Sequence, residues 1–302
     1  MPSATGFDLA CFGYLAHAQV FTVPVYPIAN RGAAATQVFP SLAGDAPITG
    51  LTARELGLTV CLVSNTVGTD PAGQTVLDAL DNAGVRHSAT PTPASDIQTP
   101  QVVVITDDAD TRTWFAWLGP AVDQLAAADL TPLNAARLSY IDCYQVIEAA
   151  ALTAISATSG PLMLNLGGDP LTETMAAAVT RRHVAFLQTS LDEANVEHAD
   201  RLADYLHSRV IADTVVITLG RHGVLARTSN ATYRTDAPTI TVRHTHGAGA
   251  AFSGGLAQAH LSGATVPEAL DAACRAGSAH CASTSHVPRP CTENNLIKEA
   301  QA

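Results

Sequence analysis

The residues most able to do chemistry in this sequence lie in one stretch, His244–Ala250, which reads HTHGAGA. A β-prone run, Thr239–Val242, precedes it, and apolar residues at helical spacing follow it from Phe252 onward. A Gly-x-Gly turn between a strand and a helix directs unpaired backbone N–H groups, and the positive end of the helix dipole, toward the same point. The turn Gly247–Gly249 therefore predicts an anion site of the kind that most often holds phosphate.

The stretch resembles the C-terminal signature of the ribokinase-like (PfkB) family of carbohydrate kinases, Asp-Thr-x-Gly-Ala-Gly-Asp-x-Phe-x-Gly-Gly. The positions that match this signature are Thr245, Gly247, Ala248, Gly249, Phe252, Gly254 and Gly255. Its two acidic positions differ: His244 replaces the first, and Ala250 replaces the second, which is the catalytic base of the family. The resemblance therefore implies a phosphate cradle without the group that deprotonates the acceptor hydroxyl.

The histidines of this region suggest two other roles, a substitute base and a metal site. His246 is a weak candidate for a substitute base, because an imidazole has a suitable pKa. It precedes the glycines, however, whereas the family's base follows them. A metal site built on His244 and His246 is less favoured, since a catalytic zinc site usually needs a third protein ligand, which the sequence does not place.

The acceptor-binding side of the family is matched in part. Gly44 and Asp45 resemble its sugar-binding signature, and Arg112 lies near the position of an arginine that reaches the substrate. Asp45 is explained equally well as the N-cap of the helix that follows, whereas an arginine such as Arg112 is more often a surface or turn residue than a substrate contact. Ala18 and Ile48 replace an Asp and an Asn of the family pattern.

The nucleotide-binding residues of the family are also matched in this sequence. Thr218, Gly220 and Gly223 resemble the family's Thr-x-Gly-x-x-Gly turn, and Ser190 and Glu193 lie where the family has Asn-x-x-Glu. The resemblance implies ATP and Mg²⁺ as cofactors, with Glu193 as a weak metal-site candidate, and leaves a monovalent cation doubtful. We favour the interpretation that Glu193 is a solvated carboxylate at the start of a helix, because Ser190 supplies no amide oxygen to a hard cation.

The elements that must position these residues alternate between strands and helices. Such alternation predicts an α/β fold with a doubly wound, mainly parallel sheet. The apolar runs expected to form its strands are 7–13, 58–63, 138–143, 162–166, 184–187 and 213–217. We expect a single ribokinase-like domain, 1–302, which includes a small β-lid formed by segments near 14–42 and 100–117.

Bulk properties narrow the class of protein. The chain has 302 residues, 47% hydrophobic and 14% charged, with a net charge of −11, which argues against nucleic-acid and anionic-membrane partners. Neither an apolar run of about 18 residues nor a signal peptide is recognisable, so we expect a cytoplasmic protein. The six cysteines form no C-x-x-C pair, which predicts buried free thiols.

These observations favour a PfkB-type scaffold for ATP-dependent phosphoryl transfer to a hydroxyl of a sugar or nucleoside, impaired or inactive because Ala250 replaces the base. The alternatives are a pseudokinase with a ligand-binding or regulatory role, and a different sugar-phosphate chemistry on the same fold. Ala250 itself fits an engineered change or a natural loss, and the further departures at Ala18, His244, Ile48 and Ser190 favour natural divergence. The family's lid often mediates dimers, so a homodimer is a further expectation.

Overall fold

The computed structural model describes residues 6–93, 97–107 and 111–284. Its main feature is a nine-stranded sheet with the strand order β15-β14-β13-β12-β11-β10-β1-β4-β6. Neighbouring strands from β6 to β13 are parallel, and the pairs at the β14–β15 edge are antiparallel. The strands are β1 (Phe7–Phe12), β4 (Val60–Val63), β6 (Arg86–His87), β10 (Ala136–Asp142), β11 (Leu162–Asn165), β12 (Val184–Ser190), β13 (Ala212–Thr218), β14 (Val224–Arg227) and β15 (Thr232–Thr235).

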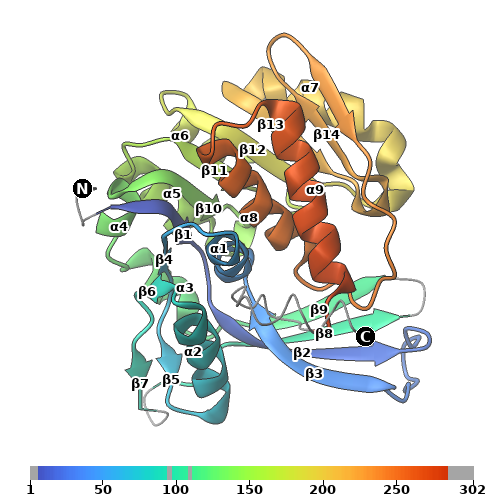
Figure 1. Cartoon of the computed structure of the whole chain (residues 1–302). Helices are drawn as coiled ribbons and strands as arrows, with labels where there is room; N and C mark the ends of the chain where they lie inside the picture. The colour runs from blue at the N-terminus through green and yellow to red at the C-terminus, as the bar shows by residue number, and fades with distance from the viewer. Residues whose placement is uncertain (1–5, 94–96, 108–110, 285–302) are drawn as a thin grey trace.

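Helices cover both faces of this sheet (Figure 1). Successive strand residues point to opposite faces, so Leu9 and Cys11 join one apolar core while Ala10 and Phe12 join the other. The first core is covered by α1 (Asp45–Glu55), α2 (Pro71–Ala83), α8 (Ala248–Leu261) and α9 (Val266–Ala282). The second is covered by α3 (Ala121–Ala126), α4 (Thr131–Asn134), α5 (Glu148–Ala157), α6 (Glu173–Val179) and α7 (Ala199–Arg209). The predicted doubly wound, mainly parallel sheet is confirmed.

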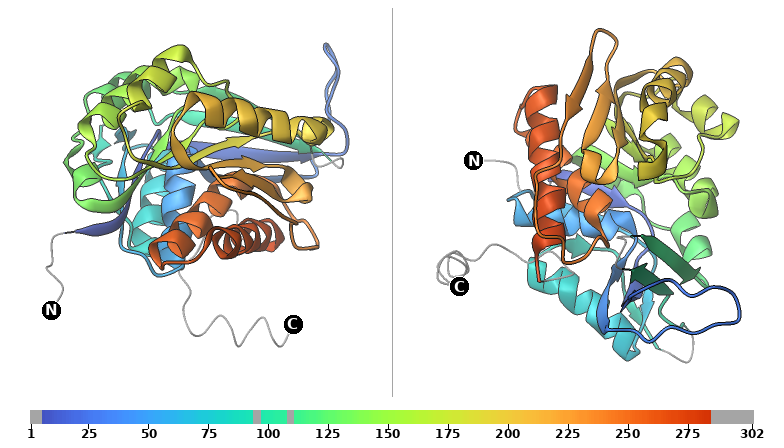
Figure 2. Two further views of the ribbon diagram at one scale, coloured as in Figure 1. Left: turned by 90° about the horizontal axis from the view of Figure 1, so that it is seen from above. Right: turned by 90° about the vertical axis from the view of Figure 1, so that its right-hand side faces the viewer.

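A second, four-stranded sheet has the order β3-β2-β8-β9. Its strands are β2 (Ala16–Val23), β3 (Gln37–Ala43), β8 (Gln101–Asp107) and β9 (Arg112–Trp117). We call this the small sheet; it lies at one end of the molecule, and the connection between β2 and β3 extends away from it (Figure 2). Its inner face carries Ala18, Val102 and Val104, which are buried together. A short pair, β5 (Val67–Gly68) with β7 (Pro91–Thr92), flanks α2.

One predicted strand is wrong. The run Thr239–Val242 forms no strand; it passes irregularly into the segment before α8 and is mostly exposed. Its residue types favour β structure, but β propensity reflects packing against neighbouring strands, and this run has none beside it.

The described residues bear on two expectations from the sequence, which concern membrane-spanning helices and the cysteines. Within them, no helix combines the length and the apolar character needed to cross a membrane. Their five cysteines, Cys11, Cys61, Cys143, Cys274 and Cys281, are buried thiols. The sixth, Cys291, lies outside the described residues.

Candidate active site

The glycine turn leads directly into α8. Gly247 is the N-cap of this helix with φ 79°, a left-handed conformation that favours glycine. A Cβ at this position would lie 2.9 Å from Nε2 of His280 and 3.1 Å from Cδ1 of Ile48. Both the backbone conformation and the packing therefore require glycine where the chain enters the helix.

The first turn of α8 is only partly open. Gly249 is exposed, and a Cβ built on it would meet nothing within 4 Å. The N–H of Ala248 donates to the carbonyl of Thr245 at 3.4 Å, and Ala250 is buried. The space for an anion therefore lies in front of Gly249 rather than across all three residues of the predicted cradle.

A hydrogen bond fixes this end of α8 relative to the large sheet. Ser253 donates from Oγ to Oε1 of Gln188 at 3.0 Å, and Gln188 lies near the carboxyl end of β12. In doubly wound sheets ligands bind beyond the carboxyl ends of the strands. The open turn of α8 is therefore positioned at the edge of the sheet where such a site is expected.

The position that the resemblance assigns to the family's base has apolar surroundings. Ala250 is 1% exposed and belongs to the same apolar cluster as Ile48 and Phe252. Its carbonyl accepts a hydrogen bond from Oγ1 of Thr49 at 3.1 Å. Ala18, at the other missing acidic position, is fully buried on the inner face of the small sheet. Neither position offers a proton acceptor on its side chain.

His246 is engaged elsewhere. Its Nε2 lies 2.7 Å from the carbonyl of Leu42 in β3, so the ring donates a proton there. Burial lowers the pKa of His246 to about 4, so the ring is neutral at pH 7. The ring of His280 packs edge-on against His244 at 4.9 Å, and its Nε2 lies 2.9 Å from the carbonyl of His246. No group of three or more metal-ligating side chains occurs in the part of the chain that the structure describes.

The N-cap interpretation of Asp45 is wrong. Gly44 occupies the cap position with φ 100°, and α1 begins at Asp45. Asp45 instead accepts a hydrogen bond at Oδ2 from Nδ2 of Asn165, at 3.0 Å. The carboxylate is half-buried at the end of the large sheet, as expected for a residue that holds a ligand hydroxyl.

Two polar residues missed by the sequence analysis complete this region. Asp142 and Asn165 are the last residues of the adjacent strands β10 and β11, and both are buried. Asp142 accepts from the N–H of Ala46 at 2.8 Å and from the hydroxyl of Tyr140 at 2.9 Å. The available signal was an acidic or amide residue directly after an apolar run, because the carboxyl ends of parallel strands meet at one edge.

We call Asp45, Asp142, Asn165 and Tyr140 the acidic cluster. Burial, and next the charge of Asp45, raise the pKa of Asp142 from 3.8 to about 8, although its hydrogen bonds act in the opposite direction. Nδ2 of Asn165 lies 2.8 Å from the hydroxyl of Tyr140 and 3.3 Å from Oδ1 of Asp142. Two carboxyl groups thus share one hydrogen-bonded network, in which burial and the charge of Asp45 favour the protonated form of Asp142.

Arg112 lies on the inner face of the small sheet, in β9. It is exposed, and its guanidinium carbon lies 5.7 Å from the ring centroid of Trp114. Its charge is one of the causes that lower the pKa of His246, after burial. Arg112 therefore faces the side of the molecule where His246 lies, and it contacts an aromatic ring there.

The predicted nucleotide turn follows β13. Thr218 ends the strand, and Gly220 and Gly223 have φ 57° and 82°. Glu193 contacts this turn: its carboxylate forms an ion pair with Arg221 at 2.8 Å and accepts the N–H of Arg221 at 2.9 Å. The structure therefore brings Glu193 and the turn together, and it gives the carboxylate a cationic partner.

A cavity of about 340 Å³ lies near the cradle. It is lined by Thr22, Thr106 and the acidic Asp107 from the small sheet and by Arg243 and Thr245 from the segment before α8. An arginine and three hydroxyl groups can all donate hydrogen bonds to an anionic or hydroxylated molecule.

Comparisons with known proteins agree with this geometry. A family model described as pfkB family carbohydrate kinase matches residues 51–290. Similar solved structures include the nucleoside kinase of Methanocaldococcus jannaschii, an archaeal member of the ribokinase family, with 17% identity, 99% of both chains covered and a TM-score of 0.73. The nucleoside kinase of Burkholderia thailandensis in complex with inosine has 19% identity, 96% of both chains covered and a TM-score of 0.77.

The Arabidopsis thaliana ribokinase complexed with ribose and ATP has 16% identity and a TM-score of 0.71, over 97% of this chain and 98% of that chain. At such identities the likeness shows a shared fold. A comparison with curated proteins finds no match.

Proposed function

The chain belongs to the pfkB family of carbohydrate kinases, and we propose that it binds a sugar or nucleoside and a nucleotide but transfers phosphate weakly or not at all. The observation that carries this proposal is the contrast within one turn of α8. Gly249 faces open space, whereas the next residue, Ala250, is buried among apolar side chains. Backbone N–H groups hold a phosphate without side-chain help, but removing a proton requires a basic group.

ATP is the phosphoryl donor that the family implies. The open turn at Gly249 and the loop Thr218–Gly223 are the parts of this chain that would hold it. Mg²⁺, when bound with ATP, neutralises phosphate charge. The side chains at this turn fit a metal ion poorly, because Glu193 already forms an ion pair with Arg221.

The acidic cluster is the proposed acceptor site. Asp45 is half-buried at the end of the large sheet, and its carboxylate, held by Asn165, presents an acceptor that can orient a hydroxyl. The small sheet would act as a lid, with the face that carries Ala18 over the acceptor. Because Ala18, Val102 and Val104 on that face are apolar, they would exclude water without contributing a carboxylate.

Thermal unfolding with ATP, ADP, uncharged sugars, nucleosides and sugar phosphates, combined with an assay of ATP turnover, tests the proposal. We expect stabilisation by a nucleotide and by at least one sugar or nucleoside, with turnover close to background. Stabilisation by a sugar phosphate alone would favour a different chemistry on this fold. Brisk turnover by the unaltered chain would overturn the assignment of the base position, and His246 would be the first residue to replace.

We further propose that the chain forms a homodimer through the outer face of the small sheet. Val38 on the edge strand β3 and Phe115 and Trp117 on the opposite edge strand β9 are 55%, 60% and 47% exposed on this face. Sedimentation of the unaltered chain should give a dimer, and Phe115→Asp should shift it to monomer. A monomer at all concentrations would exclude this interface.

A further inference from the structure

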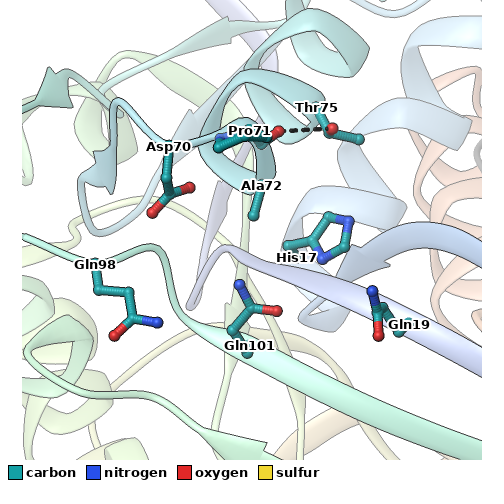
Figure 3. Close-up of a pocket in the computed structure, with 8 residues that line it drawn as sticks. All are labelled: His17, Gln19, Asp70, Pro71, Ala72, Thr75, Gln98 and Gln101. Atoms are coloured by element: carbon teal, nitrogen blue, oxygen red, sulfur yellow. Dashed lines mark hydrogen bonds between the residues drawn. The ribbon is translucent and has the colours of Figure 1, made fainter. Parts of the chain in front are cut away.

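A cavity of about 520 Å³ lies between α2 and the outer face of the small sheet (Figure 3). His17 and Gln19 project into it from β2 and Gln101 from β8, while Asp70 and Thr75 belong to the start of α2. The cavity is thus formed by one element of the main body and two strands of the small sheet, and its volume suffices for a small organic molecule.

This cavity is separate from the proposed acceptor site. Successive residues of a strand point to opposite faces, so Ala18 is on the inner face while His17 and Gln19 are on the outer one. Pairing in the sheet agrees: His17 is opposite Gln101, and Ala18 is opposite Val102. A ligand in the outer cavity would contact the same strand as the acceptor, from the other side.

One ring nitrogen beside this cavity lacks a hydrogen bond. His17 is 7% exposed, and its Nδ1 is buried without a partner, although the ring also interacts with the side chain of Gln101. Burial lowers the pKa of His17, while the hydrogen bond with Gln101 and the charge of Asp70 act in the opposite direction. A buried polar atom without a hydrogen bond is costly and uncommon in folded proteins, and a ligand that supplies the missing bond removes that cost.

The charge of the lining limits the ligand. Asp70 contributes the one carboxylate, and its oxygens already accept hydrogen bonds from the N–H of Gly73 at 2.7 Å and from the N–H and hydroxyl of Thr99 at 3.0 Å and 2.7 Å. The residues lining the cavity include no lysine or arginine. A phosphate or carboxylate ligand would therefore lie beside the Asp70 carboxylate without a counter-charge among the lining residues, which is unfavourable.

The remaining polar groups select an uncharged ligand rich in hydroxyls. Gln19, Gln98 and Gln101 each carry a donor and an acceptor on one carboxamide, which complements the donor and acceptor of a hydroxyl. The one aromatic ring in the lining, His17, is 7% exposed and offers a nucleobase little surface on which to stack. We propose that this cavity is a second binding site, distinct from the acceptor site, for an uncharged carbohydrate or polyol.

Calorimetric titration of the full chain with uncharged mono- and disaccharides, sugar phosphates and nucleosides tests this site. Gln101→Leu and Gln19→Leu should each weaken binding of the uncharged sugar about tenfold, the loss expected for one hydrogen bond to a buried ligand. Gln74→Leu is the matched control, because Gln74 lies on α2 but outside the cavity. Asp45→Asn, in the acceptor site, should weaken sugar binding there and leave the binding that Gln101→Leu weakens unchanged.

Each other outcome contradicts the proposal. Sugar binding that is lost in Asp45→Asn and kept in Gln101→Leu would place the ligand in the acceptor site alone. Binding of no uncharged sugar would show that the outer cavity is not a carbohydrate site. Tighter binding of a phosphate ester or a nucleoside, lost in Gln101→Leu, would overturn the ligand class. Gln19 is exposed, so Gln19→Leu gives a result even if Gln101→Leu unfolds the chain.

Discussion

The start of α8 and the acidic cluster differ in how their polar groups are supported. Ala250, at the base position, packs among apolar side chains. Asp142 and Asn165 hydrogen-bond to each other and to their neighbours, so each supports the others. Losing one member of a buried network leaves partners unsatisfied and destabilises the fold, whereas losing an isolated catalytic base affects only the reaction. The comparison teaches that binding groups and chemical groups in one site are retained for different physical reasons.

The largest expected effect is on phosphoryl transfer. Ala250→Asp should raise turnover about 10²- to 10⁴-fold toward an acceptor that binds, because a general base contributes that much. Since Ile48 shares the apolar cluster of Ala250, Ile48→Asn combined with Ala250→Asp is the variant that best accommodates the new carboxylate.

Ala250→Asn is the matched control, because it adds a side chain of the same size without a base. A gain in Ala250→Asp alone would show that the other machinery is intact. If both variants fold and neither turns over ATP, then the differences from the family pattern at Ala18, His244 and Ser190 also prevent catalysis. A pseudokinase is then the favoured interpretation.

The next effect concerns the stability of the acidic cluster. Asp142→Leu removes the acceptor of the Ala46 N–H and of Asn165, so it should lower the free energy of unfolding by about 3 kcal/mol. Asp142→Asn keeps an acceptor of the same shape and should cost much less at neutral pH. Urea unfolding measures both, and equal losses in the two variants would show that the network does not support the fold.

A related effect on the same carboxyl group is the pH dependence of stability. An acid whose pKa is higher in the folded than in the unfolded protein binds more protons when folded. The contribution of Asp142 to stability is therefore present below its unfolded pKa of 3.8 and is lost as the pH rises toward about 8. Relative to the unaltered chain, Asp142→Asn should gain stability between about pH 5 and about pH 8. A constant difference across this range would refute the raised pKa.

The smallest expected effect is on anion binding at α8. Gly249→Asp puts a negative charge at the open turn and should weaken stabilisation by sulfate or ATP about tenfold. Gly249→Ala is the control: its Cβ meets nothing within 4 Å, so the anion site should persist, and helix propensity should stabilise the fold by about 0.5–1 kcal/mol. Unchanged anion binding in Gly249→Asp would place the anion elsewhere.

Local patterns in the sequence determined most of the fold. Apolar runs such as Phe7–Phe12 and Leu162–Asn165 are short and lie between helical stretches, and connecting parallel strands requires such crossovers. The turn at Gly247 was equally predictable, because a glycine before an apolar helical repeat is a local signal. The run Thr239–Val242 was not, because the same residue types form a strand only when another strand lies beside them.

The tertiary structure alone decided how the site is connected. Asp45 meets Asn165, 120 residues away in sequence, and His246 donates to Leu42, 204 residues away. Neither distance leaves a trace in local sequence, so Asp45 could be read as a cap and His246 as a base. The sequence by itself determined that a carboxylate is missing at Ala250. Its apolar surroundings, and the shift in the pKa of Asp142, arise from burial, which exists only once the chain has folded.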